Sequence, residues 1–360
     1  MAQDVLAKAL ASAGKDARFR ADTFEALRRA ESNSEEPNRF RTEVRWPIVS
    51  ALLAEARYHT VALSNGLKYE IGTDSRIEQA LLLSRDVAPD HVWEPQTTKL
   101  LVALAARPGD ILVGGAYIGD QVVPMARVAA ARGAKVHAFE PMGYSFSRLV
   151  RNVQLNEFTN VVMNRAGLWD TPGELHIAGE PALSETSDAR GPAPAGADVV
   201  PAITADGYVK QHGIASVGLI MLDTEGGEEK ALRGARTLLS LPAGQAPDLV
   251  FEVHRNNVDW SHGLTRTPIL GYLIDLGYTV YALRDYHDNL ATAGLPLEMI
   301  PASKVYLEGP PHGFNMYATK NEDSLAKHGI QLVENVSPKL FLDKNPALHA
   351  PATPRAKAPA

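Results

Sequence analysis

Short apolar segments alternate with amphipathic helical segments through most of the chain after about residue 110. Residues 217–222 are apolar at both alternating sets of positions, which is typical of a strand covered on both faces. Regular alternation of strand and helix builds a parallel sheet with helices on both sides. The sequence therefore predicts a doubly wound, mostly parallel α/β sheet of seven strands, at residues 110–113, 135–139, 161–164, 217–222, 249–253, 278–283 and 315–319. Helices are expected at residues 121–132, 144–155, 204–212, 228–241 and 267–277.

The remaining segments are expected to form an extension, a loop and a tail. Residues 1–95 read as helices followed by a β-hairpin, because Asn65-Gly66 separates two alternating segments. Residues 96–342 form the α/β domain. Within it, residues 179–201 are rich in Pro, Ala, Gly and Ser and predict a mobile loop. Residues 343–360, rich in Ala, Pro and Lys, predict a disordered tail.

Composition excludes several classes of function. The 360 residues include no cysteine, which excludes disulfides, thiolate zinc sites and cysteine nucleophiles. The formal net charge of −6 provides no basic surface for nucleic acid or an anionic membrane. No apolar run approaches the roughly 18 residues of a membrane span, and the N-terminus lacks the apolar core of a signal peptide. We therefore expect a cytoplasmic protein that binds neither nucleic acid nor membrane.

A glycine-rich turn follows the first strand of the predicted sheet. It reads Gly114-Gly115-Ala116-Tyr117-Ile118-Gly119-Asp120, and a helix begins after it. Glycines allow a tight turn and let a ligand approach the backbone. Many turns need glycine for structure alone, so the pattern fits either role. In a doubly wound sheet, however, ligands bind at the carboxyl ends of the strands, where this turn lies.

An acidic residue ends the next strand. Glu140, followed by Pro141, lies 21 positions after Gly119. A carboxylate there can accept both hydrogen bonds of a ribose diol. The alternative is a solvated acid at a strand end, and the spacing from the glycine turn favours the ribose.

The glycine pattern separates two kinds of ribose-containing ligand. Dinucleotide sites use G-x-G-x-x-G, whose middle glycine leaves room for the pyrophosphate. With Gly114 first and Gly119 last, the middle position is Ala116. Its methyl group crowds a pyrophosphate but not S-adenosylmethionine, which has no phosphate. The sequence thus favours the methyl donor over NAD.

Two carboxylates follow the central strand. Asp223 and Glu225 lie where residues 217–222 give way to a loop, so one can bind the cationic end of a donor and the other can bind or deprotonate a substrate hydroxyl. The alternative is a helix N-terminus whose acids complement the helix dipole. We assign that structural role to Glu228 and Glu229 and a functional role to Asp223.

Taken in order, these motifs resemble the FkbM-type S-adenosylmethionine-dependent methyltransferases, from about Trp93 to about Lys320. The resemblance implies a class I, Rossmann-like methyltransferase fold and, typically, O-methylation of sugars and secondary metabolites. The residues that carry it are Trp93-Glu94-Pro95, Gly115–Gly119, Ala138–Pro141, Asn152, Asn156, Thr204-Ala205-Asp206, Asp223–Gly226, Leu232–Ala235 and Phe251–His254.

The resemblance also implies that the glycine turn and Glu140 hold the donor and that Asp223 and Glu225 lie at the active site. Asp223, Glu225 and His254 are the expected catalytic residues. Donor binding is expected at Glu94, Gly114, Gly115, Tyr117, Gly119, Asp120, Glu140, Pro141, Asn164 and Asp223. One position departs from the family pattern: Val113 stands where an Asp usually helps to hold the donor's ammonium group. Asp120, after the same turn, is the candidate replacement.

Several residues near the strand ends are weaker candidates. His254 can act as a base for an alcohol, and Glu252 lies on the same side of its strand. The loop residues Arg255, Asn256 and Asn257 can contact the acceptor. Asn164 can bind the adenine edge, with Trp169 beside it as a stacking ring or a core residue. His287 and Asp288, which follow the sixth strand, are weaker candidates still. Asp223, Glu252 and His254 could instead bind a metal ion, but no compact ligand motif supports a metal site and we expect none.

The sequence therefore predicts an S-adenosylmethionine-dependent methyltransferase with a small-molecule or glycan acceptor, in a chain whose N-terminal extension suggests a homodimer. Two alternatives stay open. One is a nicotinamide-dependent oxidoreductase. The other is a non-catalytic, donor-binding regulatory protein, which Val113 makes conceivable.

Overall fold

The computed structural model describes residues 2–56, 58–73, 75–84, 89–180, 183–188, 198–292, 294–307, 313–321, 329–341 and 344–352. The chain divides into two compact units. The helical unit comprises Met1–Trp93 and Asp288–Ala291, and the sheet unit comprises Glu94–His287 and Thr292–Ala360. In the described residues, no helix is both long enough and apolar enough to cross a membrane.

The helical unit contains the helices and the hairpin that the sequence predicts. Asn65-Gly66 forms the hairpin turn, with Gly66 at a φ of +82°, and joins two antiparallel strands. Arg41 and Arg45 both bond to the carboxylate of Glu31, the former at 2.6 Å. The elements are α1 (Ala2–Ala13), α2 (Ala17–Ser32), α3 (Pro37–Phe40), the π-helix η1 (Arg41–Arg45), α4 (Trp46–Leu52), β1 (His59–Ala62), β2 (Lys68–Ile71) and α5 (Arg76–Leu82).

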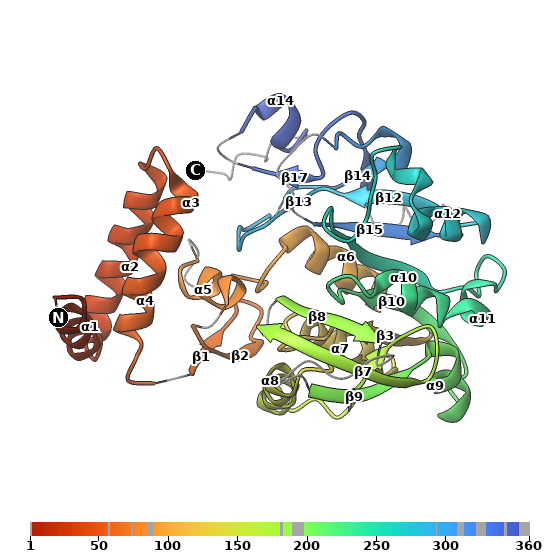
Figure 1. The fold of residues 1–360 in the computed structure, drawn as a ribbon, viewed down its shortest axis with the longest axis horizontal. Coiled ribbons are helices and arrows are strands. Elements are labelled where there is room, and N and C mark those ends of the chain that lie inside the picture. The colour runs from red at the N-terminus through yellow and green to blue at the C-terminus, as the bar shows by residue number, and fades with distance from the viewer. Residues whose placement is uncertain are drawn as a thin grey trace. The chain divides into compact units, whose positions relative to one another are not determined.

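The main sheet of the sheet unit confirms the predicted doubly wound fold (Figure 1). Five neighbouring strands are parallel, and β15 runs antiparallel between β11 and β12. Within the described residues the sheet has nine strands instead of seven, because β14 and β16 extend it beyond β12. In spatial order the strands are β16 (Ile330–Leu332), β14 (Leu297–Pro301), β12 (Thr279–Leu283), β15 (Phe314–Thr319), β11 (Asp248–Val253), β10 (Val217–Leu222), β3 (Asp110–Gly114), β4 (Val136–Phe139) and β5 (Val161–Asn164).

Alternate residues of each strand point to opposite faces of the sheet, and helices cover both faces. Alternate residues such as Leu112, Ile220 and Phe251 share one core with four helices, α9 (Ala205–Gln211), α10 (Glu228–Arg233), α11 (Arg236–Leu239) and α12 (Pro268–Asp275). The other helices that contact the sheet are α6 (Pro95–Ala105), against β10 and β14, α7 (Val122–Ala130), against β4, and α8 (Gly143–Leu155), against β5. The prediction of one continuous helix over 228–241 is wrong, because the structure has two shorter helices there, α10 and α11. The helix breaks at Gly234, where a side-chain Cβ would lie 1.9 Å from the carbonyl oxygen of Trp169.

A smaller four-stranded sheet corrects the prediction of a mobile loop. It has the order β6-β9-β7-β8, and residues expected in the loop over 179–201 form β8 and most of β9, while 181–182 and 189–197 lie outside the described residues. Trp169 packs in its core with Leu175 and Ile177. The strands are β6 (Gly167–Leu168), β7 (Gly173–Glu180), β8 (Leu183–Asp188) and β9 (Asp198–Ile203).

The C-terminal segment returns to the sheet unit. The strand β17 (Lys339–Leu340) pairs in parallel with β13 (Asp285–Tyr286). Helix α14 (Pro346–His349) follows, so residues 346–349, predicted to lie in a disordered tail, are helical and His349 is buried. Residues 353–360 of that tail lie outside the described residues. Two 3₁₀ helices, η2 (Leu264–Arg266) and η3 (Ala302–Lys304), complete the unit.

Candidate active site

The carboxyl ends of four parallel strands lie side by side. Gly114, the last residue of β3, pairs in register with Phe139 of β4 and with Leu222 of β10, and Leu222 pairs with Phe251 of β11. The next residue of each strand or loop therefore emerges at one edge of the sheet. These residues are Gly115, Glu140, Asp223 and Glu252, and they bring together the glycine turn and the carboxylates predicted from the sequence.

The glycine turn packs directly against the loop after β10. Gly115 has a φ of +75°, and a Cβ on it would lie 1.6 Å from the carbonyl oxygen of Asp223. Tyr117 also has a positive φ, of +45°, and so does Gly119, at +86°. Glycine at 115 is thus required for close approach to β10, independently of any ligand. Ala116 is buried in the turn.

Glu140 is fixed by backbone donors. Its Oε2 accepts a hydrogen bond from the backbone N–H of Tyr117 at 2.8 Å, and its Oε1 accepts one from Met142 at 2.9 Å. Burial raises the pKa of Glu140 to about 7, against the lowering effect of these bonds, and the charge of Asp120 contributes to the increase. The carboxylate is thereby held beside the glycine turn, where a ribose diol is expected.

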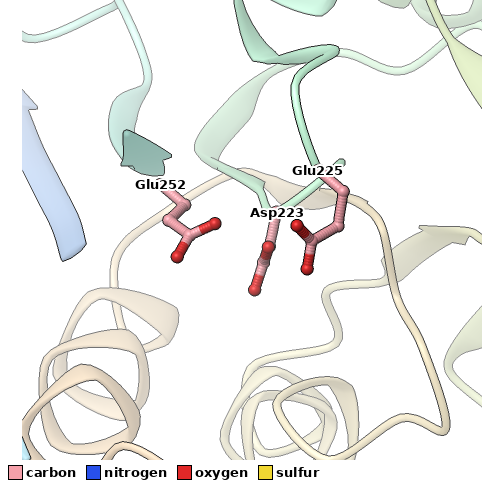
Figure 2. Close-up of side chains that lie close together, drawn as sticks. All are labelled: Asp223, Glu225 and Glu252. Atoms are coloured by element: carbon pink, nitrogen blue, oxygen red, sulfur yellow. The ribbon is translucent and has the colours of Figure 1, made fainter. Parts of the chain in front are cut away.

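Three carboxylates form what we call the acid cluster: Asp223, Glu225 and Glu252 (Figure 2). One oxygen of each lies within 4.8 Å of the others. Burial is the main cause that raises the pKa of Asp223 well above its usual value, that of Glu225 to about 7 and that of Glu252 to about 8, and neighbouring carboxylates add to each increase. The cluster therefore gathers acidic groups that oppose one another's ionisation, and a cationic ligand would favour their ionised form.

Glu94 lies among the same charges but is differently held. It is 7% exposed and adopts a left-handed backbone conformation at the start of α6, with a φ of +48°. Its Oε2 accepts a hydrogen bond from Asn315 Nδ2 at 2.6 Å, while Oε1 lies 3.2 Å from His287 Nε2 and 3.8 Å from Lys339 Nζ. Burial raises the pKa of Glu94, but these neighbours outweigh burial and the net pKa is lowered. Glu94 is therefore ionised at neutral pH.

His254 has the geometry of a neutral hydrogen-bond donor. Its Nδ1 accepts the backbone N–H of Asn256 at 3.1 Å, which places the ring proton on Nε2. Burial, followed by the charge of Lys339, lowers the pKa of His254. In this arrangement neither ring nitrogen has a free lone pair, so the predicted role of His254 as a base requires the bond from Asn256 to open.

The weaker candidates lie in varied surroundings. The Nδ2 of Asn164 bonds to the carbonyl oxygen of Ala138 at 3.2 Å and to Tyr208 Oη at 3.3 Å, so its amide donors are engaged within the fold. Asn257 packs against Gly226 of the loop after β10, and Arg255 is exposed. Asp288 belongs to the helical unit, where it lies 4.0 Å from Arg41.

Two further features concern residues discussed from the sequence. Glu228 accepts hydrogen bonds from Thr224 N at 2.7 Å and Gly226 N at 3.1 Å and so holds the turn before α10. Val113 is 1% exposed and is held in register between neighbouring strands, so no acid occupies that position of the site.

Two buried charged residues at the site were not found from the sequence. Asp285 accepts hydrogen bonds from the backbone N–H groups of Gln96 and Thr97 at the start of α6. Lys339, on β17, is 4% exposed, and the charges of Glu94, Glu252, Asp285 and Asp223 all act on it. The sequence shows only that this lysine lies between Pro338 and Leu340, and it does not show which residues surround the lysine in space.

Comparison with known families bears on this arrangement. Residues 114–280 match the family model described as the methyltransferase FkbM domain. Residues 114–280 are therefore similar to an FkbM methyltransferase domain. This match confirms the resemblance drawn from the motifs. Glu140 and the acid cluster lie within the matched region, whereas Glu94, His287, Asn315 and Lys339 lie outside it.

Several solved structures are similar to the chain at low identity. Methyltransferase FkbM from Methylobacillus flagellatus KT is 15% identical with a TM-score of 0.34, over 58% of this chain and 43%, less than half, of that chain. TYW2 from M. jannaschii in complex with AdoMet is 12% identical with a TM-score of 0.38, over 73% and 85% of the two chains. Fibrillarin from Aeropyrum pernix with natively bound S-adenosyl-L-methionine is 14% identical with a TM-score of 0.34, over 73% and 94%. No curated protein matches the sequence.

Proposed function

We propose that the protein is an S-adenosylmethionine-dependent methyltransferase that methylates a hydroxyl group on a sugar or secondary metabolite. The observation that carries the choice of donor is the acid cluster at the carboxyl ends of β10 and β11. S-adenosylmethionine brings a sulfonium and an ammonium group to a site rich in carboxylates. A nicotinamide dinucleotide brings two phosphates, which gain no attraction from acidic groups. Ala116 in the glycine turn works in the same direction.

The geometry supports a set of donor-binding residues. Both oxygens of Glu140 are held beside the turn by backbone N–H groups, and each retains acceptor capacity for a ribose hydroxyl. Gly115 and Gly119 expose the backbone of the turn, and Glu94 offers an ionised carboxylate for the donor's ammonium group. Gly114, Tyr117, Asp120, Pro141 and Asn164 complete the proposed set, with Asn164 acting through its amide oxygen.

The reaction is an in-line displacement at the sulfonium methyl group. The acceptor oxygen forms a bond to the methyl carbon as the carbon–sulfur bond breaks, and the hydroxyl proton must pass to a base. A carboxylate of the acid cluster suits this step, because the pKa values of Glu225, about 7, and Glu252, about 8, lie near the operating pH. Asp223 orients the acceptor, and His254 Nε2–H can donate to its oxygen. The products are a methyl ether and S-adenosylhomocysteine.

The acid cluster also offers the oxygen ligands that a divalent cation prefers. The expectation of no metal therefore stays a prediction, and assays with and without a chelator test it. The cytoplasmic location, the small-molecule or glycan acceptor and the homodimer likewise stay predictions.

The proposed function is tested by calorimetry on the full chain with S-adenosylmethionine, S-adenosylhomocysteine and NAD. We expect the first two to bind and NAD not to bind. Incubation with hydroxyl-bearing sugars and secondary metabolites, followed by mass spectrometry, should then reveal an added methyl group. Binding of NAD alone would replace the proposal with an oxidoreductase. Donor binding without turnover on any acceptor would favour the non-catalytic alternative.

A further inference from the structure

Lys339 is carried to the site by the C-terminal segment, which lies beyond the matched family domain. In β17 it pairs in register with Asp285 of β13. The buried Arg284 fixes the surrounding chain: its Nε donates to the carbonyl oxygen of Ser337 at 2.9 Å, and its Nη2 donates to Leu348 at 3.0 Å and Ala350 at 2.8 Å. Lys339 is therefore held on both sides by backbone contacts that do not involve its own side chain.

The ammonium group of Lys339 faces carboxylates from several elements. Its Nζ lies 3.8 Å from Glu94 Oε1, and the charges of Glu252 on β11, Asp285 on β13 and Asp223 after β10 also act on it. His287 bonds to the same oxygen of Glu94, and the charge of Lys339 reaches His254. Burial lowers the pKa of Lys339, and the surrounding carboxylates oppose that lowering. A buried ammonium is costly unless it is paired, and here the pairing is with the carboxylates of the proposed site.

Glu94 is the carboxylate that this arrangement treats differently. Asn315 and His287 bond to its two oxygens, and its pKa is lowered, whereas the pKa values of Asp223, Glu225 and Glu252 are raised. Glu94 therefore supplies a lasting negative charge beside the acid cluster. Asp120, the replacement for Val113 suggested by the sequence, instead acts on Glu140, at the ribose side.

We propose that Lys339 is a positioning residue of the donor site: its buried ammonium, with Asn315 and His287, fixes the carboxylate of Glu94, and Glu94 holds the ammonium group of the donor's methionyl part. The inference rests on the proposed function. Glu94 thereby takes the role of the Asp that usually stands at the position of Val113 and holds the donor's ammonium group. The C-terminal segment, which carries Lys339, thus contributes to donor binding.

The test compares two ligands that differ at the methionyl end. S-adenosylhomocysteine carries the ammonium group, and 5′-methylthioadenosine lacks it. Calorimetry between pH 4.5 and 8 is applied to the full-length wild type, Lys339→Met, Glu94→Gln and the double variant. The control is Lys304→Met, which removes a half-exposed lysine paired with Glu334 at 3.9 Å.

We expect Lys339→Met to weaken S-adenosylhomocysteine about tenfold at pH 5 and to leave 5′-methylthioadenosine unchanged. Loss of an opposite charge at this distance raises the pKa of a carboxyl group by about 1–3 units. The pH below which S-adenosylhomocysteine loses affinity relative to 5′-methylthioadenosine, which shares the ribose, should therefore rise by a similar amount. In the Glu94→Gln background, Lys339→Met should cost nothing further. Equal losses for both ligands, additive losses in the double variant or an unchanged pH profile would each overturn the proposal.

A second measurement without ligand separates this inference from the proposed function. If the wild type binds neither donor nor product, the proposed function fails, but the pairing of Lys339 with Glu94 can still be tested by the melting temperature. Without Lys339, folded Glu94 should retain a proton that the unfolded chain releases, so the Tm of Lys339→Met should fall relative to wild type as pH rises from about 4.5 to 7. Parallel Tm profiles for the two proteins would refute the pairing itself.

Discussion

Replacement of Glu140 by alanine should weaken donor binding at the ribose side of the site. Its two oxygens are the predicted acceptors for the ribose diol, and hydrogen bonds to an ionised group contribute about 1.5–3 kcal/mol each. Because water can partly replace the missing carboxylate as a hydrogen-bond partner, we expect a loss of about 2–4 kcal/mol in binding free energy, or about 30- to 900-fold in affinity. The backbone N–H groups of Tyr117 and Met142 also lose their acceptor, so the Tm should fall as well.

Calorimetric titration with S-adenosylhomocysteine measures this loss, beside Glu174→Ala, which removes an exposed glutamate of β7 from the same unit. The pH provides a second signature. Because the pKa of Glu140 is about 7 in the unliganded protein and a ribose diol binds the ionised form, wild-type affinity should fall about tenfold from pH 8 to pH 6. The variant should lose this component. An unchanged affinity in Glu140→Ala, with a lowered Tm, would show that Glu140 only anchors the turn.

Two further predictions concern the backbone and the acid cluster. Gly115→Ala should destabilise the protein by several kcal/mol and abolish donor binding, because its Cβ would lie 1.6 Å from the carbonyl oxygen of Asp223. The control Gly133→Ala has a similar φ of +73° but nothing within 4 Å, so it should cost only about 1 kcal/mol. Similar denaturation midpoints for the two variants would contradict the packing argument. Since burial raises the pKa of Glu252 to about 8, the folded protein binds a proton that the unfolded chain has lost above about pH 4.5, and its stability should fall as pH rises through 8. Glu252→Gln should flatten that part of the Tm profile between pH 5 and 9, and an unchanged slope would show that Glu252 is ionised in the folded protein.

The motif that carries the resemblance includes residues with purely structural work. Asp206 accepts hydrogen bonds from the backbone N–H groups of Thr237 and Leu238 and so caps α11. Asn152 donates to the carbonyl oxygen of Ile118 at 2.9 Å and thereby fixes the glycine turn from α8. Recognition of a family from sequence thus depends partly on residues that hold the turns in place, and a motif match does not separate these from residues that touch a ligand.

The sequence by itself determined the strand–helix alternation, the glycine turn and the carboxylates that follow β4 and β10. These features depend on short-range rules: apolar runs bury themselves, glycines permit positive φ angles, and residues after parallel strands emerge at one edge. The sequence did not reveal that residues 183–188 form a strand, because the Pro, Gly and Ser content around them is typical of loops.

Only the tertiary structure decided how the carboxylates are charged and held. Glu94 and Asn315 are 221 positions apart, yet they share a hydrogen bond, and Lys339 reaches the site only because β17 pairs with β13. The ionisation of each acid depends on burial and on which charges lie within a few ångströms, and these are properties of the folded neighbourhood. The same physics explains Asn164, whose amide a local pattern assigned to adenine and whose donors the fold directs to Ala138 and Tyr208.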